Sequence, residues 1–375
     1  MKKFIKFSIC VFAVLLFVSS FTVLSSAEND SVNSDMFGGE EVYESVPDEV
    51  KVLLENLGVE KIDFDSIFNI KADDVLKLIK NLITGSIESP LKATVRLIAV
   101  IVVLAASESF VSEDNKIASV MNVAGILLCI ISIINPITNA VQLAAISITV
   151  SEKFMLVLIP VMTAVISVSG NPTLAFSFQS VAFAAAQVIS AIATKALVPV
   201  IGLILSLDIS GGLMPKFSLS GITEIIKKTI TVILSFSATL FVSFLGLKAG
   251  LANSADTLAA KGIKLVISSS VPVIGGALSE AYSGLLGNIM LVKSTIGVFG
   301  ICAIALITLP SCIQLVFWIF SLRISAGVAE MFELKGIVGL LKSIASSLVL
   351  LNVIVIFVSV LFIISISLIL VLKAG

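Results

Sequence analysis

Four charged side chains lie inside long apolar runs of this sequence, and they are its best candidates for chemistry. They form two acid–base sets, Glu280 with Lys293 and Asp208 with Lys195. Burying a charge in lipid is costly, so ionisable residues inside apolar spans usually mark a pathway, a relay or a contact with a partner. Glu280 and Lys293 are thirteen residues apart, and we expect them to pair across a hairpin. The four residues are therefore predicted to serve in gating, assembly or solute coupling rather than in catalysis.

The sequence offers no recognisable enzyme centre. It contains no histidine, which excludes a Ser-His-Asp triad, a Cys-His pair and an HExxH zinc site. Its four cysteines form no CxxC motif, and no GxxxxGK[ST] or GxGxxG phosphate-binding loop occurs. We therefore expect no catalytic residue, no metal site and no cofactor, and an ATP-driven step would need a partner protein. A Ser-Lys intramembrane hydrolase stays an alternative, although no residue pair singles one out.

The composition is typical of an integral membrane protein. Of the 375 residues, 58% are hydrophobic and 13% are charged, with a mean hydropathy of +1.15, whereas about 25% charged residues are usual in soluble domains. Residues 28–90 carry fifteen of the twenty-five acids against five lysines, and the chain beyond them is mildly basic. An acidic extramembrane segment should therefore precede a membrane domain. Because no basic arm is present, we expect no nucleic-acid partner.

The chain before residue 91 divides into two predicted parts. Residues 1–27 fit a secretory signal peptide, with lysines before an apolar core and small residues at its end; an uncleaved signal anchor is the alternative. Residues 28–90 are then an acidic, partly helical extracytoplasmic segment. Within it, residues 28–46 should be disordered, and residues 86–90 should form a linker.

Two helices are predicted inside the acidic segment. The first begins at Pro47 and ends at Gly58, because proline suits the first helical position and glycine suits the C-terminal cap. The second begins at Asp73 and ends at Gly85. Both carry an apolar stripe at helical spacing, so they should pack on each other, on the membrane domain or on a partner.

Residues 91–375 are predicted to form a polytopic, all-α membrane domain with about six to eight transmembrane or re-entrant helices. Helix breaks are expected at Asn135 and Pro136, at Glu152 and Lys153, and before Pro172. Pro160 interrupts the apolar run between the last two breaks.

Further breaks are expected later in the membrane domain. Residues 197–207, which include Pro199, are too short to cross a bilayer alone, so they are either a kinked helix tail or a re-entrant piece. Residues 218–228 and 323–342 have the pattern of interfacial helices, and the first of them should precede a separate span over 229–247.

The most interrupted apolar run is residues 268–293. It contains Pro272, Gly275 and Gly276 together with Glu280 and Lys293. Irregular backbone at membrane depth is tolerated only where protein buries it or where it lines a wet cavity. We therefore predict a broken helix that lines or gates a passage.

Part of this run matches an earlier segment of the chain. VPVIGLILSLDISGGL, residues 198–213, aligns with VPVIGGALSEAYSGLL, residues 271–286, with ten of sixteen positions identical. One clear span separates the copies, so they would have opposite orientations, as in the inverted repeats of many transporters. The alternative is a pair of proline-kinked helices in a biased composition.

In the order of its predicted segments and in the amino-acid sequence of two of them, the chain resembles the stage III sporulation protein AE family. The segments are SSSVPVIGGALSEAYSGLLGNIMLVKSTIGVFGI, residues 268–301, and FMLVLIPVMTAVISVSG, residues 154–170. The resemblance implies a membrane component of the complex that spans the two membranes between mother cell and forespore. It also implies other sporulation stage III membrane proteins as partners, including an ATPase subunit, and a location in the mother-cell membrane around the forespore. It transfers no catalytic residue.

Two functions are therefore weighed. The first is a non-enzymatic subunit of that complex, whose acidic segment docks partners and whose broken segments line or gate a passage; a homo-oligomer is compatible with it. The second is a stand-alone secondary transporter for a small solute. It would use Glu280 with Lys293 and Asp208 with Lys195 as coupling or substrate groups.

Overall fold

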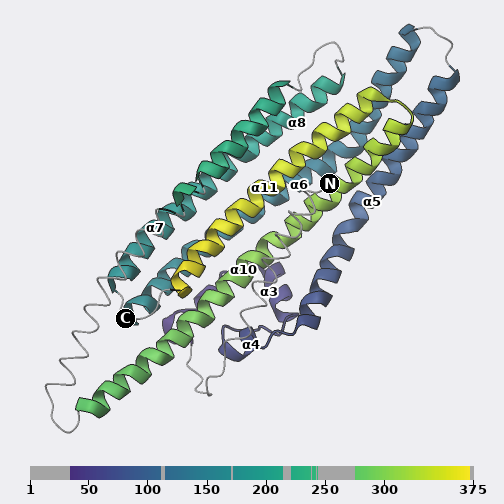
Figure 1. Cartoon of the computed structure of the whole chain (residues 1–375). Coiled ribbons are helices and arrows are strands. Elements are labelled where there is room, and N and C mark those ends of the chain that lie inside the picture. Colours follow the sequence, from purple (N-terminus) through teal and green to yellow (C-terminus); the bar gives the residue numbers. More distant parts are fainter. Residues whose placement is uncertain are drawn as a thin grey trace.

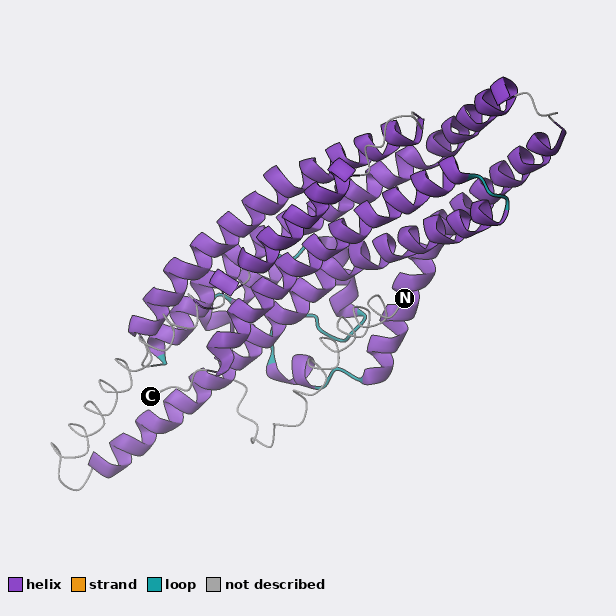
Figure 2. Ribbon diagram, turned by 45° about the horizontal axis from the view of Figure 1, so that its top comes forward, coloured by secondary structure: helices purple, strands orange, loops and turns teal. Residues whose placement is uncertain are grey.

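The structure is a computed structural model that describes residues 34–110, 115–169, 172–213, 221–243 except 238 and 242, and 275–371. Within these residues every regular element is a helix (Figure 2). The predicted all-α class is therefore confirmed. The predicted signal peptide, residues 1–27, and Pro272 lie outside the described residues.

Long helices run side by side in one elongated bundle (Figures 1 and 2). They are α5 (Ala72–Phe110), α6 (Asn115–Val168), α7 (Pro172–Ala191), α8 (Val198–Leu213), α10 (Gly275–Met331) and α11 (Lys335–Val371). A π-helical turn, Ile192–Leu197, joins α7 to α8 without a break. Residues 221–237 form a further helix. Helices α5, α7–α8 and α10 run in one direction along the bundle, and α6, 221–237 and α11 run in the other (Figure 1).

Five stretches in the described part of the chain are long and apolar enough to cross a membrane. They are Ala72–Ser107, Val120–Val168, Ala175–Leu213, Ile289–Met331 and Lys335–Ser367. The chain is thus a polytopic helical membrane protein. Several predicted helices are parts of one long helix, and the predicted span 229–247 lies partly outside the described residues. Helix α6 alone has 54 residues, about 81 Å at 1.5 Å per residue, whereas about 20 residues suffice to cross a bilayer.

The predicted breaks inside α5 and α6 are wrong. Helix α5 continues through Gly85 and through the predicted linker at 86–90, and α6 continues through Asn135, Pro136 and Glu152. A proline removes one backbone hydrogen bond, but ending a helix in an apolar surrounding would leave several more groups unsatisfied. The buried hydroxyl of Ser321 donates to the Pro90 carbonyl at 3.1 Å, so α10 is hydrogen-bonded to α5 at this proline.

Two other boundaries differ from the predictions, and a third decides between two predicted alternatives. Residues 221–237 are helical without an interruption at 228, so no separate interfacial helix precedes the span. The predicted piece 323–342 is divided by a tight turn at Glu333, which has a positive φ of 59°. Residues 197–207 continue from α7 through the π-helical turn, which selects the helix tail over the re-entrant piece. The helix expected to begin at Pro172 is confirmed.

The two copies of the self-match run in the same direction. The first copy forms α8, and the described part of the second, residues 275–286, begins α10 (Figure 1). An inverted repeat requires opposite directions, so that prediction is wrong for the described residues. The first copy is the last part of the continuous helix α7–α8. The antiparallel helix 221–237 then returns the chain to the end of the bundle from which α7 started, so α10 begins there and runs in the same direction as α8.

The N-terminal cap, which we define as residues 34–68, packs on the side of the bundle. It contains a 3₁₀ turn (Ser34–Phe37), α2 (Gly39–Glu44), α3 (Asp48–Glu55) and α4 (Phe64–Phe68). The predicted helix from Pro47 to Gly58 is confirmed to within a few residues. The disorder predicted for 28–46 is wrong from Ser34 onward, because Val42 and Val46 are buried and the Tyr43 ring lies 6.0 Å from the Phe299 ring of α10.

Candidate functional site

A buried ion pair links α8 to the helix 221–237. The Lys227 ammonium lies 3.3 Å from the Asp208 Oδ2 atom, and the Ser347 hydroxyl donates to the same oxygen at 2.7 Å. The Asp208 side chain is only 1% exposed and that of Lys227 is 17% exposed. Such a charge is tolerated in an apolar bundle only where it is paired and hydrogen-bonded.

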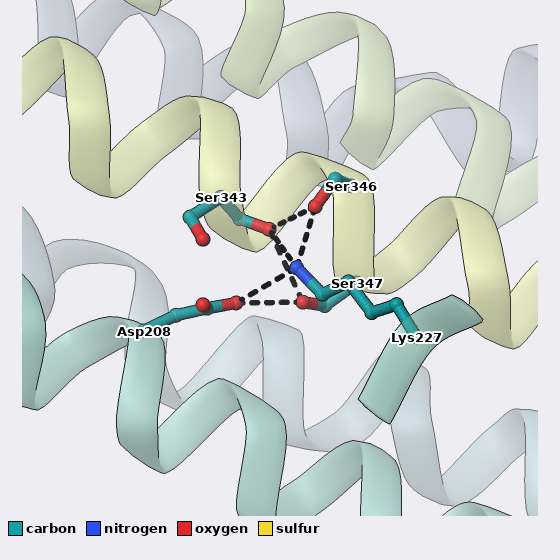
Figure 3. Close-up of polar contacts among 5 residues, drawn as sticks. All are labelled: Asp208, Lys227, Ser343, Ser346 and Ser347. Carbon is teal, nitrogen blue, oxygen red and sulfur yellow. Dashed lines mark hydrogen bonds and ion pairs between the residues drawn. The ribbon is translucent and has the colours of Figure 1, made fainter. Parts of the chain in front are cut away.

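Lys227 also reaches α11. Its ammonium donates to the Ser346 hydroxyl at 2.6 Å and to the Ser343 carbonyl at 3.3 Å. Figure 3 shows the side chains of Asp208 and Lys227 converging on one turn of α11. We call Asp208, Lys227, Ser343, Ser346 and Ser347 the polar cluster. It connects α8 and the helix 221–237 with α11, which is distant from both in the sequence.

The local sequence explains how these helices come so close. Ser343, Ser346 and Ser347 are spaced i, i+3, i+4 and therefore share one face of α11. Small residues allow helices to approach closely in membranes. On α8, Gly212 follows Asp208 by one turn, and a methyl group added to it would lie 3.2 Å from the Leu340 Cδ1 atom of α11.

The cluster is suited to holding helices together rather than to binding a metal. One carboxylate and one ammonium neutralise each other, and serine hydroxyls complete their hydrogen bonds. Among the described residues, no group of three His, Cys, Asp or Glu side chains could hold a metal ion. Breaking a buried pair by removing one partner generally costs about 3–5 kcal/mol, so the cluster ties the positions of the three helices to its charge state.

Asp208 and its predicted partner Lys195 lie far apart in the structure. Lys195 lies in the π-helical turn and is exposed. Thirteen residues of continuous helix separate it from Asp208, about 20 Å along the axis. The predicted Asp208–Lys195 set is therefore wrong. Pro199 lies in the first turn of α8 and is also exposed.

The pairing predicted for Glu280 and Lys293 is wrong for the same reason. Both residues belong to α10, which is continuous from Gly275, so they lie about 20 Å apart along one axis. Gly275 and Gly276 are the first two residues of α10, and the interruption predicted for 268–293 is absent from Gly275 onward. Lys293 is buried. Pro160 is exposed within α6.

A second polar contact joins α6 to α7 at a position that the sequence suggested as a helix end. The buried Ser190 hydroxyl donates to the Glu152 Oε2 atom at 2.5 Å. Glu152 lies inside α6 instead of terminating a helix. The acid thus serves as a contact between neighbouring helices.

The family described as stage III sporulation protein AE has a sequence model that matches residues 60–373 of this chain. The chain belongs to the stage III sporulation protein AE family. It is 20% identical over 243 residues to "Stage III sporulation protein AE" of Bacillus subtilis (strain 168). That match covers 65% of this chain and spans 61% of the relative's length. No solved structure matches.

The family match confirms the resemblance noted in the sequence and covers all of the long helices up to residue 373. It therefore includes every member of the polar cluster. Sequence reasoning identified Asp208 in this stage III sporulation protein AE chain, but it missed Lys227 and the three serines of α11. Lys227 was assigned to the polar face of an interfacial helix. The i, i+3, i+4 serine spacing within an apolar run was the one signal that could have suggested a partner.

Proposed function

We propose that this chain is a non-enzymatic, multi-pass membrane subunit of the complex that connects mother cell and forespore, and that forespore development requires it. The observation that carries the proposal is the family match over residues 60–373. The printed name of the Bacillus subtilis relative also assigns that protein to stage III of sporulation. The mother-cell membrane around the forespore is the location that this role requires.

The N-terminal cap is the part of the chain that we assign to partner binding. Its outer surface carries the exposed acids Glu40, Glu41, Glu44, Asp48, Glu49 and Glu55. Its inner side is occupied by contacts with α6 and α10, including the Tyr43–Phe299 ring contact. Other sporulation stage III membrane proteins, among them an ATPase subunit, are the proposed partners of the acidic face.

The polar cluster is assigned a role in assembly or gating within the subunit. Its ion pair supports this role because it fixes α8, 221–237 and α11 relative to one another. A stand-alone transporter was first suggested by two acid–base sets, and neither set is brought together in the bundle. The subunit function is therefore the one that the geometry supports better.

Deletion and complementation in the organism that encodes the chain test the proposal. We expect the deletion strain to lose heat-resistant spores and the wild-type gene to restore them. An affinity-tagged chain purified from sporulating cells should bring down an ATPase subunit, and the chain alone in liposomes should transport no solute. Normal sporulation of the deletion strain would contradict the role, and solute uptake by the purified chain would favour the transporter.

A matched pair of variants connects this function to the polar cluster. Lys227→Met removes the ammonium that touches Asp208, whereas Lys228→Met removes the exposed neighbouring lysine. We expect the first to reduce spore formation relative to the amount of the chain in the membrane, which immunoblotting measures, and the second to leave it unchanged. Equal sporulation of both variants would mean that the cluster has no part in the function.

A further inference from the structure

A polar pocket of 450 Å³ lies between α5, α6 and α10. Its polar lining comes from all three helices: Ser89 and Arg96 of α5, Ser132, Asn135 and Asn139 of α6, and Trp318 of α10. It shares no residue with the polar cluster. Arg96, Asn135 and Asn139 are exposed, so the pocket opens to the outer surface of the bundle.

Large apolar side chains cover much of the surface beside the pocket. Val95 and Val103 of α5 and Leu128, Ile131 and Ile134 of α6 are large exposed hydrophobic residues. Both helices contain stretches that can cross a membrane, so this face is suited to contact with lipid. An arginine and two amides in such a place are costly unless water or a polar ligand meets them.

The groups that line the pocket can donate hydrogen bonds but carry no compensating negative charge. Arg96 forms no ion pair among the described residues. Trp318 is 1% exposed, and its indole N–H has no hydrogen-bond partner in the described part of the chain. No Asp or Glu is among the described residues that line the pocket. A buried donor without an acceptor, in the same pocket as a cation without an ion-pair partner, favours an anionic ligand.

Phosphate is the anion that suits this lining best. The planar guanidinium of arginine presents two parallel N–H donors that match two phosphate oxygens. Amide groups at positions 135 and 139 lie one helical turn apart on the same face of α6, so both can serve the same ligand. We propose that this pocket binds a phosphate group, with Arg96 pairing with its oxygens and with Asn135, Asn139 and Trp318 as further donors.

The phosphate could come from the headgroup of an anionic phospholipid or from a soluble phosphate, and one fluorescence experiment distinguishes the two. Trp318 is the single tryptophan of the chain, so tryptophan emission reports on this pocket alone. The full chain, purified in an uncharged maltoside detergent, is titrated separately with phosphatidylglycerol, phosphatidylcholine and inorganic phosphate. A saturable emission change with phosphatidylglycerol but not with the other two assigns the lipid headgroup. A saturable change with inorganic phosphate assigns the soluble source.

Variants decide whether a response belongs to the pocket. Arg96→Met should weaken binding about tenfold or more, as expected when a hydrogen bond to a charged group is lost, and Arg96→Lys should retain part of it. Arg323→Met is the matched control, because it removes the chain's other arginine, which is exposed on α10, and it should bind as the wild type does. Asn139→Leu, which changes no charge, should also weaken binding.

Two results would overturn the proposal. One is the absence of a saturable change with both phosphatidylglycerol and inorganic phosphate. The other is an Arg96→Met variant that binds with the wild-type affinity. The circular dichroism melt of each variant, measured in the same detergent, shows whether its fold is retained, and Asn139→Leu tests the pocket independently if Arg96→Met is not folded.

Discussion

The carboxylate of Asp208 makes the stability of three helices depend on one charge. Its Oδ2 atom contacts both the Lys227 ammonium and the Ser347 hydroxyl, and its side chain is 1% exposed. Asp208→Asn keeps the shape but leaves the lysine without its counter-ion. We expect a loss of about 3 kcal/mol in the free energy of unfolding, at the lower end for a broken buried pair because Lys227 retains some exposure. Denaturant unfolding in detergent measures it.

The double-mutant cycle with Lys227→Met separates the pair from its surroundings. The single Lys227→Met variant should be at least as damaging, because it leaves a carboxylate that is almost fully buried without a cation. The double variant should lose less free energy of unfolding than the two single variants lose in total. Lys228→Met, at the exposed neighbouring position, should stay within about 0.5 kcal/mol of the wild type. Wild-type stability of Asp208→Asn would show that the pair contributes nothing.

Tyr43 makes the N-terminal cap sensitive to alkaline pH. Burial raises the pKa of its phenol above the usual 10.0, so the folded cap favours the neutral form. The unfolded cap ionises first, and the stability of the cap therefore falls as the pH rises above about 10. The hydrogen bond to Glu44 raises the pKa of Lys51 above 10.5. The stabilisation from this hydrogen bond is present at lower pH and is lost as the pH rises through the folded-state pKa of Lys51. It therefore changes the stability of the cap in the same direction as the ionisation of Tyr43.

Phenolate absorbance together with limited proteolysis of the cap tests this pH dependence. The chain has two tyrosines, so the Tyr43→Phe variant identifies the component that belongs to Tyr43. We expect cleavage within the cap to increase above pH 10 in the wild type, and to start at higher pH in the variant. An unchanged cleavage pattern between pH 9 and pH 11 would refute the linkage.

At the scale of elements, the contact of α5 with α6 depends on the absence of a side chain at Gly125. A methyl group there would lie 2.3 Å from Leu104 Cδ1 and 3.1 Å from its Cγ atom, and Leu104 is buried. Gly125→Ala should therefore destabilise, since overpacking costs about 1–3 kcal/mol. Gly202→Ala in α8 meets nothing within 4 Å and should gain up to about 1 kcal/mol of helix propensity. Thermal unfolding compares them, and equal melting temperatures would contradict the packing argument.

The long helices illustrate which features a sequence of this kind can predict. Apolar runs predicted the helices themselves, and Pro47, Gly58 and Pro172 placed helix ends to within a few residues. The predicted breaks at Pro90 and Pro136 were wrong, since both helices are continuous through these prolines and ending a helix in an apolar surrounding would leave several backbone groups unsatisfied. Cap preferences reflect competition with water, and in an apolar bundle that competition is weak.

The polar cluster could be predicted only in part, for a geometric reason. Asp208 was noticeable as a lone acid in an apolar run. Its partners lie 19 and 139 residues further along the chain, and no local pattern connects such positions. Glu280 and Lys293 were equally noticeable, yet one continuous helix keeps them apart. Charge spacing along the sequence predicts a contact only when the path of the backbone between the charges is known.

At the scale of the whole molecule, different elements lie at the two ends of the bundle. The turn at Glu333 and the C-terminal end of α8 lie at one end, and the start of α10 lies at the other (Figure 1). The N-terminal cap contacts α10 at Phe299. Thirty-two residues of α10 separate Phe299 from Met331, about 48 Å, which exceeds the hydrocarbon thickness of about 30 Å. The cap and the Glu333 turn should therefore face opposite sides of the membrane.

Labelling of single cysteines tests this topology, because a membrane-impermeant maleimide reaches only one side of intact cells. In a background with the four native cysteines replaced by serine, we place Glu55→Cys in the cap, Glu333→Cys in the turn and Ser210→Cys near the end of α8, all at exposed positions. The predicted signal peptide implies an extracytoplasmic cap. If the cap is extracytoplasmic, Glu55→Cys should label in intact cells and the other two only after permeabilisation. Labelling of Glu55→Cys and Glu333→Cys from the same side would contradict the arrangement. Parallel helices must end on the same side of the membrane, so Ser210→Cys should label from the same side as Glu333→Cys. If Ser210→Cys instead labels as Glu55→Cys does, α8 and α10 are antiparallel, as the inverted repeat predicted.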